Sequence, residues 1–412
     1  MATHNVKDMA HLPPSVLAAK CCTDAQATYL LADYFPTKGL SMEYYERERH
    51  IIPMLEFISQ RGIRLDQERR AELDELYSRD YAYYLTQARG FGFEPSAPRQ
   101  VGYALASRGN FLPMTRGKTQ LATDDVTLKK CKDPLAALVL NFRHVQKMLT
   151  TYIRPLAGQE RAYTTLHLDA ITGRVSSGGA GRSDPDRNLQ NIPKKVERGN
   201  MPTVRSMFLP DDGDNVWTRI DAVQIELRVL AYLSQDQRML SIFESGGDLH
   251  QATSEALHIT RDYAKIFNFA LIYLGDDYTL ANNIGTSDLA AVRRMRAFWA
   301  DSFPQAARWV TVQQLEGLRN GYVETLYGRR MPLPLDMGEK HARSCSVDYP
   351  IQGTAAEVFK IYLLALLEFL PSMRLLVHDE DLMSGRLEMP KGLEDLTPVR
   401  VPMKVEHIER WG

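Results

Sequence analysis

The sequence lacks several features that would place a protein in a class at once. It has four cysteines in 412 residues and no Cys-x-x-Cys pair, which argues against a structural zinc site and against a disulfide framework. Its longest apolar run, residues 361–370, is too short to span a bilayer. The N-terminus has no apolar segment of the kind found in signal peptides. We therefore expect a protein of the reducing cytosol.

An excess of charge of one sign is missing as well. The formal net charge is −1, so no overall field indicates a nucleic-acid partner. The charge is unevenly spread, however, since residues 81–160 contain 11 lysines and arginines but only 5 acidic residues. A basic stretch of this kind suits a grip on a phosphate backbone, and it suits a merely solvated face equally well.

The sequence also shows no internal repeat and no low-complexity tract. Its length predicts two or three sub-domains. Helical periodicity covers residues 41–90, whereas the Gly-, Ser- and Asp-rich residues 173–193 are expected to form a loop. The other predicted elements are helices over 134–154, 261–274 and 353–371, strands over 374–377 and 399–407, and a strand that turns helical within 215–233.

Two of the predicted strands end in an aspartate. Asp221 follows one apolar strand, and Asp379 follows another, in the sequence LLVHDEDLM over 375–383. Acids at a hairpin tip are usually just solvated. If the two strands lie side by side, however, the carboxylates repel each other unless a cation lies between them. Two Mg²⁺ ions would satisfy both carboxylates, and they could activate a 3′-hydroxyl and stabilise a leaving pyrophosphate.

The helix predicted from Arg261 carries a second candidate site. Arg261, Lys265, Phe269 and Tyr273 are four residues apart and therefore share one side of the helix. The two cations could clamp a triphosphate while the rings stack on a base. An ordinary amphipathic helix with cationic ends and a core-facing aromatic stripe would give the same spacing.

In their order along the chain, these motifs resemble the DNA polymerase I family, family A, over roughly residues 40–412. The resemblance rests on Asp221 to Arg228 (DAVQIELR), on the helix motif from Arg261 to Tyr273, and on VHDE at 377–380. Further matching segments are TGR at 172–174, NLQNIP at 188–193, YVETLYGRR at 322–330 and PIQGTAA at 350–356. So many matches in register make chance implausible.

The resemblance implies an α/β right-hand polymerase fold, with an antiparallel palm sheet, helical fingers and a helical thumb. It implies a template-directed DNA polymerase that adds dNTPs to a primer 3′-OH. The expected sub-domains are an exonuclease-like remnant over 1–40, the thumb and its base over 41–165, the first part of the palm over 166–240, the fingers over 241–340, and the second part of the palm over 341–412.

The resemblance also implies residue roles. Asp221 and Asp379, with the backbone carbonyl of Ala222, would bind two Mg²⁺ ions, which Mn²⁺ could replace; Glu380 would support the site, and Lys265 would assist catalysis. Glu226 would exclude a ribose 2′-OH. The expected nucleotide-binding residues are Arg261, Lys265, Phe269, Tyr273, Glu226, Gln224 and His250. The expected DNA-binding residues are Arg174, Asn191, Gln352, His378, Arg228 and Lys147. Arg174 and Gln352 would read minor-groove acceptors common to all base pairs.

Some positions depart from the family pattern. Ala270 stands where the family usually has glycine, and Leu274 intrudes between Tyr273 and Gly275, so we expect altered fingers closure. Asp348 stands where the family usually has asparagine, and an extra acid there could weaken primer–template binding. Asp381 matches no functional position and is expected to be a solvated acid. Residues 178–182 resemble an insertion, and the segment 384–397 is shorter than the helix expected there.

The N-terminal residues and the spacing give further expectations. Lys20 replaces the tyrosine of the last exonuclease motif, and the earlier acidic motifs would lie before residue 1, so no proofreading by this chain is expected. The compact spacing between His250 and Arg261 favours a phage-like enzyme. The expected partners are primer–template DNA and dNTPs, with a separate exonuclease or processivity subunit as a further candidate. A monomer in the cytoplasm of a bacterial cell or a phage-infected host is expected, with no membrane association.

Three other classes fit parts of the sequence. A single-subunit RNA polymerase shares the aspartates and the cationic helix but lacks a gate glutamate such as Glu226. A metal phosphohydrolase of the His-Asp type would carry His378 and Asp379 on a helix rather than at the end of a strand. A DNA-binding scaffold would not need paired carboxylates.

Overall fold

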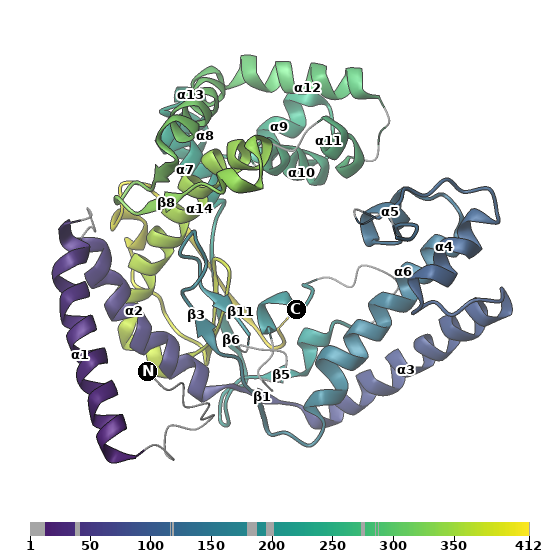
Figure 1. Ribbon diagram of the computed structural model, residues 1–412, viewed down its shortest axis with the longest axis horizontal. Coiled ribbons are helices and arrows are strands. Elements are labelled where there is room, and N and C mark those ends of the chain that lie inside the picture. The colour runs from purple at the N-terminus through teal and green to yellow at the C-terminus, as the bar shows by residue number, and fades with distance from the viewer. Residues whose placement is uncertain are drawn as a thin grey trace.

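The computed structural model describes residues 13–37, 42–115, 117, 119–178, 188–194, 202–272, 277–284, 286 and 288–411. Within these ranges a central sheet lies between two groups of helices, and the three together form an open arc (Figure 1). No helix within these ranges is both long enough and apolar enough to cross a bilayer.

Four strands form the central sheet. They are β6 (Trp217–Ala222), β9 (Met373–Val377), β10 (Glu380–Ser384) and β11 (Met403–Ile408). The order across the sheet is β11-β6-β10-β9, and each pair of neighbours is antiparallel. The strands predicted before Asp221 and before His378 are thus both present, one on each side of β10. The last predicted strand begins at Met403, four residues later than expected.

Both faces of the sheet are covered. Ile220 and Leu376 belong to one apolar cluster, which also contains residues of the helices α2 and α14, whereas Trp217 and Leu382 belong to a second cluster with Trp411. Burial of apolar side chains on both faces is the main stabilising term for such a sheet. Strands β9 and β10 are buried along their whole length, whereas the edge strand β11 is partly exposed.

Two helices are directly continuous with the sheet. The first, α7 (Ile225–Ser234), follows β6, and the second, α14 (Glu339–Ala365), precedes β9 in the chain. The prediction of a helix over 353–371 is correct for the end of α14, but the helix begins at Glu339 and ends before Pro371. It continues through Pro350, which the sequence analysis took as a motif residue outside the helix.

The first helical lobe comprises α3 (Gln67–Gly90), α4 (Pro98–Ala106), α5 (Asp125–Lys130) and α6 (Pro134–Lys147). Side chains of Asp66, Asp124 and Asp133 cap the N-termini of α3, α5 and α6, which satisfies backbone N–H groups that would otherwise lack partners. The lobe has its own apolar cluster. It contains most of the basic stretch 81–160.

The helical character predicted for residues 41–90 is observed, but not as one helix. The segment forms two helices, α2 (Met42–Arg61) and α3, separated by β1 (Ile63–Leu65). Gly62 ends α2 with a φ of +60°, a conformation that favours glycine. Strand β1 pairs with β2 (Arg161–Ala162) and with β5 (Phe208–Leu209), so the base of the first lobe is tied to the chain that enters the central sheet.

The second helical lobe comprises α8 (Gln237–Glu244), α9 (Leu249–Leu257), α10 (Arg261–Ile272), α11 (Asp277–Asn283), α12 (Leu289–Ser302) and α13 (Pro304–Asn320). Asp236, which is fully buried, accepts hydrogen bonds from Met239 N at the start of α8 and from Gln305 N and Ala306 N at the start of α13. One carboxylate therefore joins the first and the last helix of the lobe.

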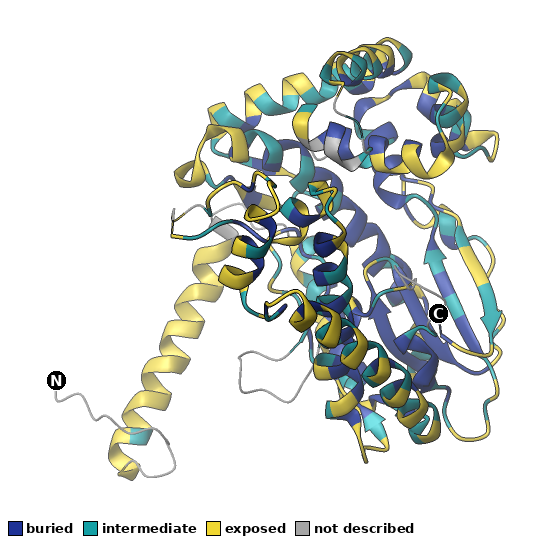
Figure 2. Cartoon of the chain, turned by 90° about the vertical axis from the view of Figure 1, so that its right-hand side faces the viewer, coloured by how far each residue is buried: buried dark blue, intermediate teal, exposed yellow. Residues whose placement is uncertain are grey.

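The remaining elements are short hairpins and one long helix. The hairpins are β3 (Leu166–His167) with β4 (Ser176–Ser177), and β7 (Tyr322–Glu324) with β8 (Arg330–Pro332). The long helix, α1 (Pro14–Thr37), projects from the body and is exposed along nearly its whole length (Figure 2). Between β10 and β11 the chain forms only a short turn of helix at 393–395, in agreement with the short segment expected there.

Candidate active site

The two aspartates predicted to form a pair lie at the same end of the central sheet. In the pairing of β6 with β10, Asp221 is opposite Glu380, the residue that follows Asp379. The backbone N–H of Ala222 donates a hydrogen bond to the carbonyl oxygen of Asp379 (3.0 Å). The two aspartates therefore lie close together, but β6 and β9 are not side by side as the prediction assumed, because β10 lies between them.

The turn between β9 and β10 holds Asp379 in place. It consists of His378 and Asp379 alone, because Val377 pairs with Glu380. His378 has a φ of 58°, in the left-handed region that is uncommon for residues other than glycine. Strained positions of this kind cluster at functional sites, where the surrounding structure holds them. The acids thus lie at a hairpin tip, but at one that faces a second strand carrying a carboxylate.

Repulsion between carboxylates characterises this end of the sheet. Burial, and then the charge of the neighbouring Asp221, raise the pKa of Asp379 to about 6. Burial also raises the pKa of Asp221, although the Lys194 ammonium opposes this rise. Both shifts mean that the folded protein holds the charged carboxylates at a cost. A cation bound between them would remove that cost.

The donor set fits magnesium. Mg²⁺ prefers oxygen ligands and is commonly held by one or two carboxylates together with substrate phosphates and water. Asp221 and Asp379 supply such a pair. Among the residues placed by the structure, no three His, Cys, Asp or Glu side chains converge as a preformed metal centre would require. The arrangement therefore suits a metal whose remaining ligands arrive with the substrate.

Glu380 is held by the protein rather than presented to solvent. Its side chain is buried, and one carboxylate oxygen accepts a hydrogen bond from the indole Nε1 of Trp411 (3.3 Å). The other oxygen lies 3.3 Å from Lys194 Nζ and 3.9 Å from Arg219 Nε. These contacts fix the Glu380 carboxylate beside Asp221, which fits the supporting role predicted for it.

A second group of charged residues joins the loop before β4 to α7 and α14. Arg174 forms a close ion pair with the buried Glu226. Gln352 Nε2 donates a hydrogen bond to Asp348 Oδ1 (2.7 Å). Burial raises the pKa of Asp348 to about 6, and the charge of Glu226 adds to the rise. Both groups predicted to read the DNA minor groove, Arg174 and Gln352, are therefore bound to carboxylates in this state.

Helix α10 presents its cationic side to solvent. Arg261 and Lys265 are exposed, whereas Ala264 and Phe267 on the opposite side are buried, so the predicted face is observed for these positions. The Arg261 guanidinium donates from Nε (3.0 Å) and Nη2 (2.5 Å) to Asp248 Oδ2, at the start of α9. Arg261 is thus positioned by a carboxylate but remains accessible.

An aromatic pair lies beside these cations. Lys265 Nζ is 6.0 Å from the centroid of the Phe269 ring, and the ring centroids of Phe269 and His250 are 5.6 Å apart. His250 is buried, which lowers its pKa to about 4, so its imidazole is neutral at pH 7. Tyr273 and Leu274 lie outside the described residues. Ala270 is buried within α10.

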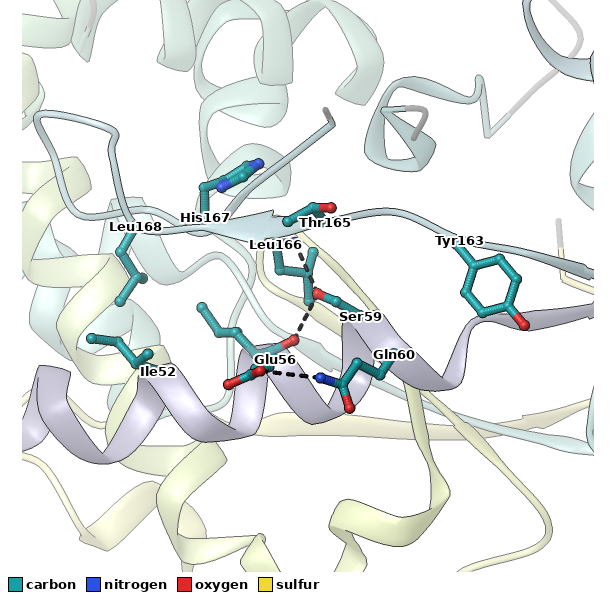
Figure 3. A pocket seen from close by; sticks show the side chains of 10 residues that line it. Ile52, Glu56, Ser59, Gln60, Tyr163, Thr165, Leu166, His167 and Leu168 are labelled. Carbon is teal, nitrogen blue, oxygen red and sulfur yellow. Dashed lines mark hydrogen bonds between the residues drawn. The ribbon is translucent and has the colours of Figure 1, made fainter. Parts of the chain in front are cut away.

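A groove lies on another part of the molecule, away from the paired aspartates. It has a volume of about 620 Å³ and runs between α2 and the extended segment 163–168, with Ile52, Glu56 and Gln60 on one side and Leu166 and Leu168 on the other (Figure 3). Its lining includes neither member of the predicted carboxylate pair. The groove is therefore separate from the candidate site.

Comparison with known proteins assigns the family. A family model described as DNA polymerase family A matches residues 63–396. The chain belongs to DNA polymerase family A. The match includes both lobes and the strands β6, β9 and β10, and therefore includes the paired aspartates.

The family A relatives are bacterial enzymes. DNA polymerase I of Streptococcus pneumoniae TIGR4 is 29% identical over 406 residues, which cover 91% of this chain and 45% of that protein. The thermostable DNA polymerase I of Thermus filiformis is 30% identical over 429 residues, covering 92% of this chain and 49% of that protein. The chain therefore spans about half the length of these curated relatives.

A solved structure shares the fold of this family A chain. It is described as the POL domain of Pol1 from M. smegmatis in complex with DNA primer-template and dNTP. The two chains superimpose with a TM-score of 0.75 at 24% identity, covering 87% of this chain and 69% of the other.

The other residues predicted to bind DNA or nucleotide differ in their exposure and contacts. Asn191, His378 and Lys147 are exposed and accessible to a nucleic acid. Gln224 adopts a left-handed conformation at the start of α7, with φ of 53°. Arg228 is different: its guanidinium is buried, donates to the carbonyl oxygens of Val223 and Arg400, and stacks on Phe243. These contacts give Arg228 a structural role and do not support its predicted contact with DNA.

The sequence analysis missed two residues of the site and misplaced a third. Lys194 and Trp411 contact Glu380 from distant parts of the chain, and no local pattern marks either. Asp381, expected to be solvated, is 1% exposed, with both carboxyl oxygens lacking a hydrogen-bond partner within the described structure. The expectation for Asp381 is wrong because β10 is covered on both faces, so neither side of the strand faces solvent.

Proposed function

We propose that this chain is a template-directed DNA polymerase that adds dNTPs to a primer 3′-OH. The observation that carries the proposal is the placement of Asp221 and Asp379 on adjacent elements at one end of the central sheet, with the pKa of each raised. A phosphoryl-transfer site that uses two metal ions needs such a pair.

In the proposed reaction, Asp221 and Asp379 would hold the metal ions, with the Ala222 carbonyl as a further candidate ligand. Mg²⁺, or Mn²⁺ in its place, would supply there the positive charge that favours a 3′-alkoxide and a leaving pyrophosphate. Glu380, held by the indole of Trp411, would support the site from its position opposite Asp221.

The proposed substrate contacts are assigned to helices α10 and α7. Arg261 and Lys265 offer exposed cations to a triphosphate, and the Phe269 ring lies beside Lys265 for stacking on the incoming nucleotide. Glu226 at the start of α7 is buried and paired with Arg174. A carboxylate fixed in this way is rigid enough to exclude a ribose 2′-OH by steric contact, so dNTPs are the proposed substrates.

The same proposal assigns the lobes. The central sheet corresponds to a palm, the first helical lobe to a thumb that holds duplex DNA by its phosphates, and the second helical lobe to fingers. A phage-like origin, the lack of proofreading, a monomeric state, a cytoplasmic location and a separate exonuclease or processivity partner stay predictions from the sequence.

Primer extension tests the proposal. The chain is incubated with Mg²⁺ and a primed DNA template, with dNTPs or rNTPs, beside Asp221→Ala and Asp379→Ala. Asp395→Ala is the matched control, because Asp395 pairs with Arg400 on the surface. We expect extension with dNTPs only, retained in the control and lost in both site variants.

Two results would contradict the proposal. If the unmodified chain binds duplex DNA but does not extend it, the scaffold alternative is favoured. If extension survives in Asp221→Ala or Asp379→Ala, the metal site lies elsewhere. Equal extension with rNTPs would remove the gate role from Glu226 while leaving the metal site intact.

A further inference from the structure

A lysine ammonium group lies against the carboxylates of the proposed metal site. Lys194 Nζ is 3.3 Å from Glu380 Oε2 and 4.0 Å from Asp221 Oδ2. Lys194 follows the helical turn Leu189–Asn191, far in sequence from both strands. Its side chain is 51% exposed, whereas that of Glu380 is 7% exposed. The cation therefore reaches the carboxylates from the solvent side.

The other cations near this point are held mainly by other groups, although Arg219 Nε also lies 3.9 Å from Glu380 Oε2. Arg219 uses its terminal nitrogen in a close ion pair with Glu406. Arg205 is buried, and donates from two nitrogens to the carbonyl oxygen of Ile192. Lys194, by contrast, has only Asp221 and Glu380 as ion-pair partners within the described part of the chain. Its position is thus determined by the carboxylates themselves.

We propose that Lys194 is the resident counter-ion of the metal site: its ammonium neutralises Asp221 and Glu380 in the metal-free protein and competes with a divalent cation for this position. The inference rests on the proposed function, since it assumes that Asp221 binds the metal. It assigns to Lys194 a role in regulating when the metal binds.

The position of Lys194 allows a metal ion to replace its ammonium group with little loss of free energy. A lysine side chain is long and flexible, and one that is half exposed can swing into solvent and keep its charge hydrated. A metal that arrives alone must displace this ammonium. A metal that arrives with a nucleotide triphosphate brings negative charge to which the released ammonium can turn. Lys194 therefore favours joint binding of metal and nucleotide over binding of the metal alone.

Manganese binding to the free protein tests this role without any polymerase reaction. Mn²⁺ is titrated into the chain in the absence of DNA and nucleotide, and unbound Mn²⁺ is counted by electron paramagnetic resonance. We compare Lys194→Met, which removes the charge, with Lys194→Arg, which keeps it. Lys391→Met is the control, because Lys391 is exposed and makes no ion pair in the described structure.

We expect Lys194→Met to bind Mn²⁺ about fivefold more tightly, or more, because a unit charge at ~4 Å is removed from the competition. The difference should shrink as salt is added, since half-exposed charges are screened. Lys194→Arg and Lys391→Met should bind like the unmodified chain. Without metal, Lys194→Met should melt at a lower temperature, and Mn²⁺ should raise its melting temperature more than that of the unmodified chain.

Unchanged Mn²⁺ affinity in Lys194→Met would overturn the inference. If Lys194→Met also binds duplex DNA more weakly in that case, Lys194 is a phosphate contact instead. Asp221→Asn separates this failure from that of the proposed function. If Asp221→Asn still binds Mn²⁺ with full affinity, the metal site itself is misassigned, whatever Lys194 does.

Discussion

Replacing Asp381 with valine is expected to stabilise the protein. Asp381 is the second residue of β10 and lies opposite Ile220 on one neighbouring strand and Leu376 on the other. It is 1% exposed, and both carboxyl oxygens lack a partner among the residues that the structure describes. Burial, and then the charge of Glu380, raise the pKa of Asp381 well above its usual range.

The magnitude follows from the protonation that burial enforces. A carboxyl group of ordinary pKa about 3.9 costs about 5 kcal/mol to keep protonated at pH 7.5, at 1.36 kcal/mol per pH unit. An unpaired polar group in an apolar site costs about 1–3 kcal/mol more. Valine is larger than aspartate, and the overpacking it causes lowers the stability by about 1–3 kcal/mol. Together these terms predict that Asp381→Val raises the free energy of unfolding by about 3–7 kcal/mol at pH 7.5.

The pH dependence gives this prediction its sign. Because the folded-state pKa is raised, the unfolded chain releases its proton first as the pH rises above about 4. The Asp381 carboxyl therefore lowers the stability of the unmodified chain from that pH upward, and the variant lacks this contribution. At pH 5 the protonation cost is only about 1.5 kcal/mol, so the gain from Asp381→Val should be about 3 kcal/mol smaller there than at pH 7.5.

Urea unfolding at the two pH values measures the effect. Tryptophan fluorescence is a suitable signal, because Trp217 and Trp411 are fully buried in the cluster beneath the sheet. Asp381→Asn is the matched variant: it removes the titration but keeps a polar group, so it should lose the pH dependence and gain less stability. A loss of stability in Asp381→Val at pH 7.5, or an equal gain at both pH values, would refute this reasoning.

Three further predictions follow from single contacts. Asp348→Asn should tighten duplex binding, measured by fluorescence anisotropy, severalfold at pH 7.5, because it removes a negative charge beside Glu226. At pH 5 the two proteins should bind alike, because burial raises the pKa of Asp348 to about 6 and its carboxyl is then protonated. Gly173→Ala should lower the free energy of unfolding, measured in urea, by about 2 kcal/mol or more, since its Cβ would meet the Arg329 side chain, whereas Gly158→Ala, with a similar φ and open space, should lose less. Asp236→Ala should cost about 3 kcal/mol in the same assay, because three backbone N–H groups lose their acceptor.

The parts of the site that the sequence predicted are those set by local pattern. An apolar run followed by an acid identified the ends of β6 and β9, and four-residue spacing identified the cationic face of α10. The break between α2 and α3 had a local signal too. Gly62 ends one helix and Asp66 caps the next, a glycine stop followed by an N-cap, which the periodicity of residues 41–90 concealed.

Asp381 shows where local pattern loses its meaning. In a strand with one solvated face, the residue next to a buried one is exposed, and the acids at 379–381 would alternate between site and solvent. Strand β10 is instead the inner neighbour of β6 and β9 and is buried along its whole length. The alternation of side chains along β10 then determines which of the two apolar clusters each side chain joins, but it does not determine whether the side chain is exposed to solvent. The burial of Asp381 depends on the layers packed over both faces.

The electrostatics of the site depend on longer connections still. The Glu380 carboxylate is held by Lys194, 186 residues earlier, and by Trp411, 31 residues later. Neither contact leaves a mark in the sequence near Glu380, because each depends on how the chain entering β6 and the chain leaving β11 meet at one end of the sheet. The carboxylates can thus be predicted from the local sequence, whereas the position of their counter-ion, Lys194, depends on how the whole chain folds. Substitutions at Lys194 can therefore change metal binding while every family motif remains intact.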